Sequence, residues 1–208
     1  MTHNAQVPVY ITNIRTRQAS NPVTRPPGPV TVALSPFAAY PASAARRISV
    51  RVTRPEPARL LLEYELQGDP AGVAIARIAD EVDGLTVPTH GLWRHTCMEL
   101  FVCDAPRGPY LEFNFAPRGQ WAAYRFSGYR AGMAPLTGIR PPRIELRTTS
   151  DALLLSADVA LPADLATGSQ LGLAAVVEDV GQQLSYWALR HPGDRPDFHR
   201  PDSFVLEI

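Results

Sequence analysis

The sequence predicts an all-β fold, an antiparallel β-sandwich of the jelly-roll type. About ten short segments alternate apolar and polar residues, which is the side-chain period of a strand, and Pro- and Gly-rich turns separate them. No heptad pattern, internal repeat or long amphipathic helix interrupts this series. With 208 residues, 45% of them hydrophobic, the chain is long enough to bury the core of one such domain.

The first 28 residues differ in character from the rest. They are polar and end in NPVTRPPGP, which predicts an extended N-terminal lead-in at 1–28 and a single sandwich domain at 29–208. The lead-in has neither an apolar segment nor a cleavage signature. No stretch has the length of a membrane span, so we expect a cytoplasmic protein without a membrane partner.

Strands are predicted on both sides of a central region. Val30–Leu34 is the first, and Ile48–Val52 and Leu60–Leu66 form a hairpin around PEPA. Further segments predicted as strands are Val73–Ile78, the hairpin Ile144–Thr148 with Leu153–Val159, the pair Leu171–Glu178 with Leu184–Leu189, and Ser203–Ile208. Pro162–Leu165 predicts one helical turn, and residues 127–142 predict a long loop, a feature that is often functional.

The central region, 92–126, contains two of the three Trp, both Cys and four of the seven Phe. Its three alternating runs, Thr96–Cys103, Tyr110–Phe115 and Gln120–Phe126, predict an antiparallel meander with a polar-aromatic face. Glu99 stands out because it lies on a strand that is otherwise apolar on both faces. A buried carboxylate needs a partner, a proton or a wet pocket, so Glu99 marks a candidate binding site.

Charge and cysteine content exclude several function classes. Twenty acidic residues balance twenty basic ones, and the basic residues are scattered, so no nucleic-acid partner is expected. All basic residues are Arg, which excludes Schiff-base and P-loop lysines. Cys97 and Cys103, six residues apart on one strand, lie roughly 20 Å apart, too far for a disulfide. Free thiols fit a reducing compartment.

The chain resembles the DOMON-like proteins of bacteria, which are related to family 9 carbohydrate-binding modules. The resemblance rests on LWRHTCMELFV, on YLEFNFAPRGQWAAYRF followed by GYRAGM, and on SYWALRHPGDRPDFHRPDSF, and it covers roughly residues 30–208. It implies a jelly-roll-like sandwich that binds a small-molecule ligand, with sugar and haem as the two ligand types among relatives.

In the sugar-binding relatives, two Trp rings hold the sugar and a carboxylate follows the first Trp. Trp93 and Glu99 match that arrangement, and Trp187 matches the second Trp. An indole stacks on the apolar face of a sugar and a carboxylate accepts from its hydroxyls. The resemblance therefore implies stacking by Trp93 and Trp187 and hydroxyl binding by Glu99. Orienting roles are expected for Arg94 and Asn114, with Arg118 and Gln120 as further candidates, and a pocket rim from His191 to His199.

Other interpretations stay open at this stage. Trp93 and Trp187 are equally compatible with a core role, and Trp121 is more typical of a core residue. The tail offers His191, Asp194, Asp197 and His199 as metal ligands, although their spacing matches no known metal motif. Candidate axial ligands for haem are His95, Met98, Met133 and His199, but His95 and Met98 differ in strand parity and no CxxCH is present.

Catalysis has weak support in the sequence. His95 and Cys97 lie about 7 Å apart on one strand face, outside direct hydrogen-bond reach. Glu99 and Glu112 on neighbouring strands form the single candidate carboxylate pair for glycoside hydrolysis. We therefore expect a non-catalytic binder of a sugar or sugar-bearing metabolite, with no metal and no cofactor. The alternatives are a haem- or metal-binding domain and a structural or interaction domain with a degenerate site. Oligomeric state is not predicted.

Overall fold

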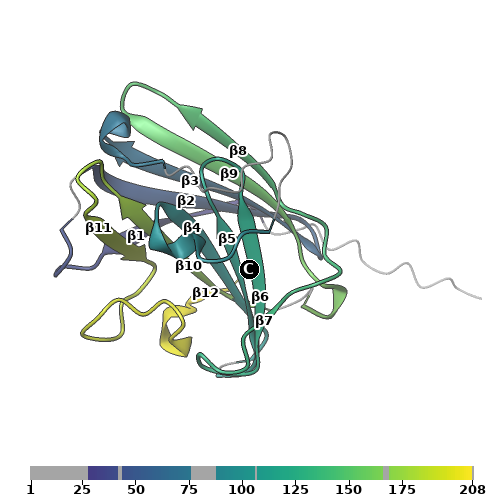
Figure 1. Ribbon diagram of the computed structural model, residues 1–208. Helices are drawn as coiled ribbons and strands as arrows, with labels where there is room; N and C mark the ends of the chain where they lie inside the picture. The colour runs from purple at the N-terminus through teal and green to yellow at the C-terminus, as the bar shows by residue number, and fades with distance from the viewer. Residues whose placement is uncertain (1–27, 42–43, 76–87, 106, 166–168, 208) are drawn as a thin grey trace, which may run out of the picture.

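The computed structural model describes residues 28–41, 44–75, 88–105, 107–165 and 169–207. Its strands pair only antiparallel and form two packed sheets (Figure 1). The first sheet contains β1 (Val30–Pro36), β2 (Ala45–Glu56), β3 (Arg59–Gly68), β8 (Arg143–Thr148) and β9 (Ala152–Ala160). The second contains β4 (Cys97–Cys103), β5 (Tyr110–Phe115), β6 (Trp121–Phe126), β7 (Ala134–Pro135), β10 (Gln170–Glu178), β11 (Leu184–Ala188) and β12 (Leu206–Glu207). The predicted β-sandwich is confirmed.

The strand order explains how one chain builds both sheets. The first sheet runs β1-β2-β3-β9-β8, and the second runs β7-β6-β5-β4-β10-β11 with β12 paired to β10. β1 belongs to both, because Val30–Leu34 pair with β2 whereas Ser35 and Pro36 pair with β11. This shared strand closes one edge of the sandwich and leaves no exposed strand edge there.

Most predicted strands and hairpins occur where the alternation placed them. The meander β4-β5-β6 and the hairpins β2-β3, β8-β9 and β10-β11 are all present. The turn predicted at Pro162–Leu165 is a 3-10 turn at Ala163–Leu165.

Three predicted segments have a different outcome. The last strand is shorter than Ser203–Ile208, because Ser203 ends a 3-10 turn and only Leu206 and Glu207 pair with β10. Of the predicted strand Val73–Ile78, Val73 forms one bridge to Asp179, and its last three residues lie outside the described residues. The lead-in prediction also falls on residues outside the described ranges, apart from Gly28.

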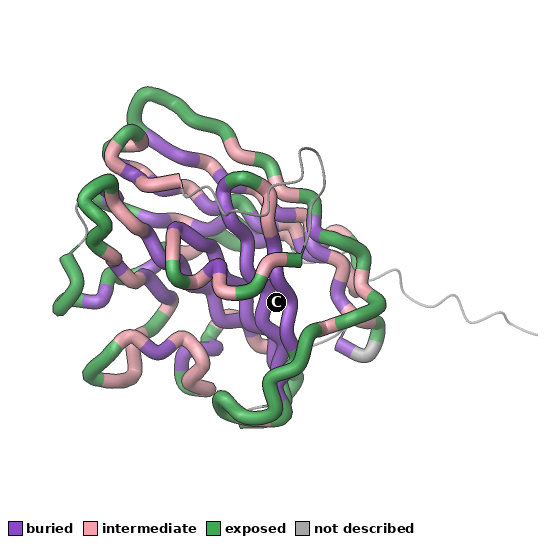
Figure 2. Tube along the Cα trace, in the orientation of Figure 1, coloured by how far each residue is buried: buried purple, intermediate pink, exposed green. Residues whose placement is uncertain are grey.

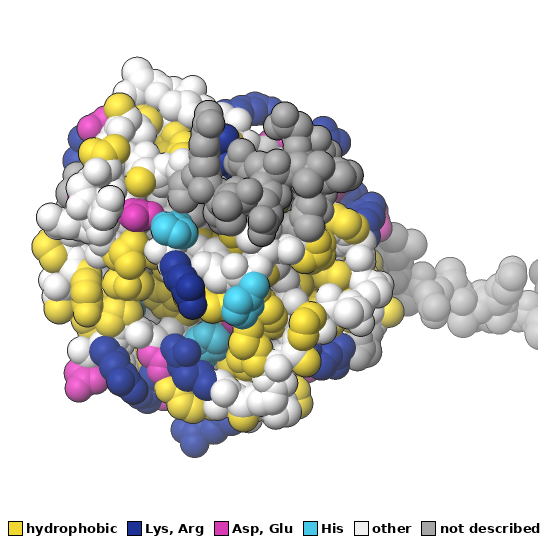
Figure 3. Space-filling model, in the orientation of Figure 1, with side chains coloured by type: hydrophobic (Ala, Val, Ile, Leu, Met, Phe, Trp, Pro, Cys, Tyr) yellow, Lys and Arg dark blue, Asp and Glu magenta, His cyan; other side chains and the backbone are white. Residues whose placement is uncertain are grey.

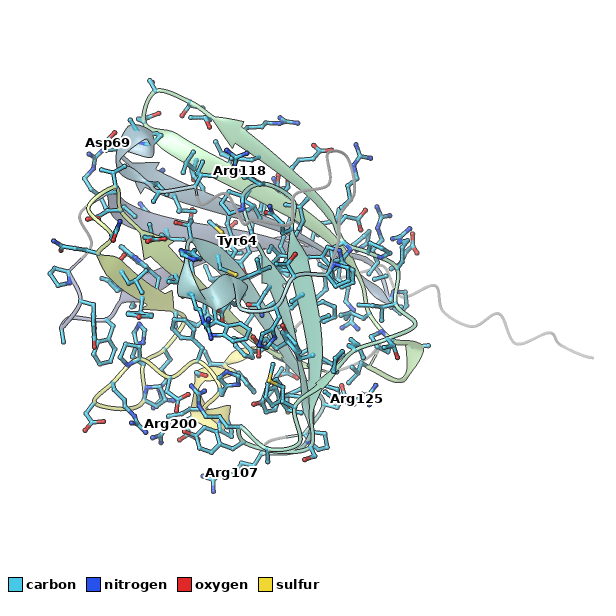
Figure 4. The ribbon with its side chains drawn as sticks, viewed as in Figure 1. Tyr64, Asp69, Arg107, Arg118, Arg125 and Arg200 are labelled. Carbon is cyan, nitrogen blue, oxygen red and sulfur yellow. The ribbon has the colours of Figure 1, made fainter. Side chains whose placement is uncertain are left out.

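The main core lies between the two sheets and takes one side-chain row from every long strand. Figure 2 shows the buried residues along the inner strands. Tyr64 of β3 is fully buried in it (Figure 4), and its hydroxyl donates a 2.8 Å hydrogen bond to the Glu99 carbonyl oxygen of β4. Buried hydroxyl groups need such a partner. This bond ties the first sheet to the second sheet beneath the backbone of Glu99.

A second apolar cluster covers the other face of the second sheet. It contains Phe101, Tyr110, Phe126 and Phe204, and it lies under the C-terminal segment 189–204. Phe204 stacks on Phe101 with ring centroids 5.5 Å apart. Gly172 permits this contact, because a Cβ atom there would lie 2.5 Å from the Phe204 ring. The C-terminal segment is therefore packed onto the sheet and can form the wall of a site.

No described helix is long and apolar enough to cross a membrane; the described helical turns are all 3-10 turns of three residues. Cys97 and Cys103 are both free and buried, as the strand spacing predicted.

Candidate functional site

A cavity of about 280 Å³ lies on the face of the second sheet that carries the second cluster. Its lining comes from the sheet, from the 3-10 turn η2 (Leu92–Arg94), from the loop after β6 and from the C-terminal segment. The lining residues are Trp93, Glu99, Glu112, Phe126, Arg130, Met133, Val176, Tyr186, Pro196, Phe198 and His199. Figure 3 shows histidine and arginine side chains gathered around hydrophobic ones at the centre of this face.

Two carboxyl groups form the base of the cavity. Glu99 of β4 is paired across the ladder with Asn114 of β5, so Glu112 is its diagonal neighbour on the same face, roughly 7–8 Å away. Both side chains are buried, each with 3% of its surface exposed. Burial and the nearby Glu112 charge raise the pKa of Glu99 well above its usual range. Burial likewise raises the pKa of Glu112, to about 7.

Asn114 supports this pair from below and does not line the cavity. Its side chain is fully buried, and its Nδ2 donates a 2.6 Å hydrogen bond to Glu112 Oε1. Its Oδ1 lies 3.6 Å from the Cys97 thiol. Asn114 was expected to orient a ligand directly; in the structure its amide instead holds the carboxyl group of Glu112.

His199 closes the cavity from the C-terminal segment. Its Nδ1 lies 2.8 Å from the Tyr110 hydroxyl, and its Nε2 lies 3.8 Å from Glu112 Oε2. Burial, with help from the Arg130 charge, lowers the pKa of His199 to about 4. The imidazole is therefore neutral at pH 7, and its 3.8 Å separation from Glu112 is not an ion pair.

Arg130 enters the cavity from the loop after β6 and is held by Asp197. The Asp197 Oδ1 atom accepts hydrogen bonds from Arg130 Nη2 at 2.7 Å and from Nε at 3.1 Å, and Tyr129 donates to the other oxygen. Arg130 adopts a φ of 50°, in the left-handed region that costs a non-Gly residue about 1–2 kcal/mol. Such strained residues cluster at functional sites, where the surrounding contacts hold them.

Aromatic side chains form the walls. Trp93 is half-buried on η2 and meets His90 edge-on, with centroids 5.0 Å apart. His90 Nδ1 lies 2.9 Å from the Tyr124 hydroxyl, so a hydrogen-bonded pair supports the indole. Tyr186 of β11 and Phe198 line the opposite side, with ring centroids 6.2 Å apart. Trp93 thus lies where the sequence placed it, beside Glu99 in one cavity.

Trp187 and Arg94 do not lie where the sequence placed them. Trp187 is 2% exposed in the core between the sheets, where its Nε1 donates to the Ser185 hydroxyl at 3.1 Å. Side chains alternate along a strand, so Trp187 points away from the cavity and Tyr186 takes the wall position. Arg94 is exposed on η2, outside the cavity lining. Trp121 lies in the main core, as expected.

Of the remaining residues predicted for the site, some line the cavity and others do not. Arg118 (Figure 4) and Gln120 belong to the turn between β5 and β6, and neither lines the cavity. In the predicted rim, Pro196, Phe198 and His199 line the cavity, whereas His191 lies at Ser35, with 2.8 Å between its Nε2 and the Ser35 carbonyl oxygen.

Sequence reasoning missed Tyr186, Arg130 and Phe126 as site residues, and it named Met133 only as a candidate haem ligand. The alternation in β11 contained the signal for Tyr186, because residues 185 and 187 share one face and residue 186 the other. Which face receives the ligand depends on where the C-terminal segment packs, and alternation does not report that. Arg130 lies in a loop, where no periodicity operates.

The residues considered as metal or haem ligands lie in several different surroundings. Within the described ranges, no group of three or more His, Cys, Asp and Glu residues is arranged to hold a metal ion. For haem, Met98 lies in the main core, and His95 Nδ1 is engaged by Glu178 at 2.7 Å. His199 turns one nitrogen to Tyr110 and the other toward Glu112. The fourth haem candidate, Met133, lines the same cavity as His199.

No protein-family model matches this chain, and no curated protein matches it by sequence. Several solved structures are similar in fold. A candidate carbohydrate-binding protein from Bacteroides uniformis has a TM-score of 0.57 at 15% identity, covering 85% of this chain and 84% of its own.

A family 9 carbohydrate-binding module from Caldicellulosiruptor kristjanssonii in complex with cellotriose has a TM-score of 0.53 at 12% identity. The match covers 83% of this chain and 79% of that one. At such low sequence identity, the structural similarity shows the fold alone. The protein has the sandwich fold of the family 9 carbohydrate-binding modules.

Proposed function

We propose that this protein is a non-catalytic, DOMON-like binding domain that holds a sugar or sugar-bearing metabolite in the cavity between Trp93 and Tyr186. One observation carries the proposal: a cavity walled by aromatic rings has two buried carboxyl groups at its base. Aromatic faces suit the apolar face of a pyranose, and carboxyl oxygens suit its hydroxyls. The sandwich fold shared with a module solved with cellotriose supports the same ligand class.

The dimensions favour one sugar ring. Ligand pockets commonly have volumes of roughly 300–1,000 Å³, and this cavity, at about 280 Å³, lies just below that range. A monosaccharide, or one terminal ring of a longer molecule, is the ligand size that we propose.

The free thiols of Cys97 and Cys103 support the expectation of a reducing, cytoplasmic environment.

The test is a titration of intrinsic Trp fluorescence with a panel of mono- and disaccharides, cello-oligosaccharides and nucleotide sugars. The proposal expects a saturable change with at least one sugar class, lost in Trp93→Ala and retained in Trp187→Phe. A flat response to the whole panel, from a protein that calorimetry shows to be folded, would refute it.

A further inference from the structure

The two carboxyl groups at the base of the cavity are incompletely satisfied by the protein. Glu112 accepts from Asn114 at 2.6 Å, but its other oxygen is 3.8 Å from the nearest cationic candidate, His199. No described side chain donates a hydrogen bond to the Glu99 carboxyl group, although it is 97% buried and lines the cavity. A buried carboxyl group without a donor is costly, so the cavity is prepared for a donor from outside.

The positive groups around the pair are already used or are neutral. Arg130 lines the cavity, but its Nε and Nη2 donate to Asp197, whose negative charge balances that of the guanidinium. The Arg130 charge lowers the pKa of Glu99 and Glu112, but burial outweighs it and the pKa of both stays raised. His199 is neutral because it is buried and has a pKa of about 4. Tyr110, Tyr124 and Cys97 also surround the pair, and each has a pKa raised by burial and is therefore uncharged.

The charge balance of the cavity is therefore negative whenever either carboxyl group ionises. Glu112, with a pKa of about 7, and the more strongly shifted Glu99 share protons in the absence of a ligand. Burial, and for Glu99 also the Glu112 charge, keeps the pair protonated, and a ligand with a positive charge favours the ionised form. Binding would then release one proton to solvent. The single carboxylate formed would neutralise the charge of the ligand, while the other carboxyl group keeps its proton.

The walls suit a cation as well. Trp93, Tyr186, Phe126 and Phe198 line the same cavity. The negative faces of aromatic rings attract ammonium groups, and the attraction grows when the group is desolvated. The cavity has aromatic walls and two carboxyl groups at its floor. Proteins use these two features to bind an organic cation.

We propose that the ligand bears a positively charged amino group, which binds at Glu99 and Glu112 while the rest of the molecule contacts the aromatic walls. The inference rests on the proposed function, and it names the sugar class as an amino sugar with a free amine. A sugar whose amine is acetylated lacks the charge and adds bulk, so the cavity discriminates against it.

The test compares glucose, glucosamine and N-acetylglucosamine by isothermal titration calorimetry at pH 6.5, with tetramethylammonium as a cation that is not a sugar. These sugars share the pyranose and differ at one substituent, so the comparison isolates the charge. We expect glucosamine to bind about 10- to 100-fold more tightly than the other two, the range of a charge-assisted hydrogen bond. In Glu99→Gln this preference should disappear, while Glu63→Gln, an exposed residue of β3, should preserve it.

The outcomes separate this inference from the proposed function. Equal binding of all three sugars would overturn the amine preference and leave sugar binding intact. Binding of glucosamine and tetramethylammonium without any neutral sugar would support the cation site and count against a general sugar binder. Absence of binding by every compound would overturn both.

Discussion

Tyr186 and Trp187 are consecutive residues of β11, yet Tyr186 lines the cavity and Trp187 is buried between the two sheets. Their neighbours in β10 repeat the separation, because Val176 opposite Tyr186 lines the cavity and Ala175 opposite Trp187 belongs to the main core. A ligand contact and a core contact are thus separated by one position in the chain, and substitutions at the two should have different effects.

Tyr186→Ala should lower ligand affinity roughly tenfold with a small effect on stability, because it removes one half-exposed wall of the cavity. Trp187→Phe should preserve affinity and lower the free energy of unfolding by about 1–3 kcal/mol, through a smaller core side chain and the lost bond to Ser185. Ligand titration and urea denaturation of both variants measure the two effects. If Trp187→Phe weakened ligand binding and Tyr186→Ala did not, Trp187 would be the residue that contacts the ligand.

Glu112 should make stability fall as the pH rises. Its pKa is about 7 in the folded state and 4.5 ordinarily, so between these values the folded protein holds a proton that the unfolded chain has lost. Its contribution is complete below pH 4.5 and is lost toward pH 7, a change on the order of 3 kcal/mol. The difference in unfolding free energy between wild type and Glu112→Gln, followed by urea denaturation from pH 4 to 8, should show this decline. A difference independent of pH would contradict it.

His199, in contrast to Glu112, should make stability increase as the pH rises. Its folded-state pKa of about 4 lies below the ordinary 6.5, so the unfolded chain takes up a proton in this range before the folded protein does. The stability contributed by the neutral ring is complete above pH 6.5 and is lost as the pH falls to 4. Relative to His199→Gln, the free energy of unfolding of the wild type should increase as the pH rises from 4 to 6.5. NMR titration of the ring carbons offers an independent check, and a midpoint near 6.5 would count against a buried, neutral His199.

Gly172→Ala should loosen the C-terminal segment. The added Cβ atom would lie 2.5 Å from the Phe204 ring, so the ring must leave its stacked position on Phe101. We expect a loss of about 1–3 kcal/mol and faster proteolysis after residue 189. Because that segment also carries Phe198 and His199, ligand affinity should fall too. Unchanged stability would mean that Phe204 is free to move. Gly128→Ala is a suitable control, since a Cβ there meets nothing within 4 Å.

Much of the fold could be predicted because strands alternate with a period of two. The hairpins, the central meander and the isolated carboxylate at Glu99 all follow from that alternation and from the cost of a buried charge. The sharing of β1 between sheets did not follow, because Ser35 and Pro36 leave one partner strand for another without a change in pattern.

The site was predictable in part. Glu99 could be found from its position on a strand and Trp93, on the turn η2, from the family resemblance. Arg130 and Phe198 depend on how two irregular segments pack against the sheet. Arg130 and Asp197 are 67 residues apart and meet through a 2.7 Å hydrogen bond that no local pattern encodes. The choice between Tyr186 and Trp187 likewise depended on which face of β11 lies under the C-terminal segment.

The central claim is that the cavity beside Trp93 binds a sugar. The most direct measurement follows the three Trp indole N–H signals by NMR during titration with the sugar panel, with each signal assigned from a Trp→Phe variant. We predict that the Trp93 signal shifts saturably while the signals of Trp121 and Trp187, both in the main core, stay in place. Shifts confined to Trp121 or Trp187, or no shift with any sugar at tens of millimolar, would contradict the account.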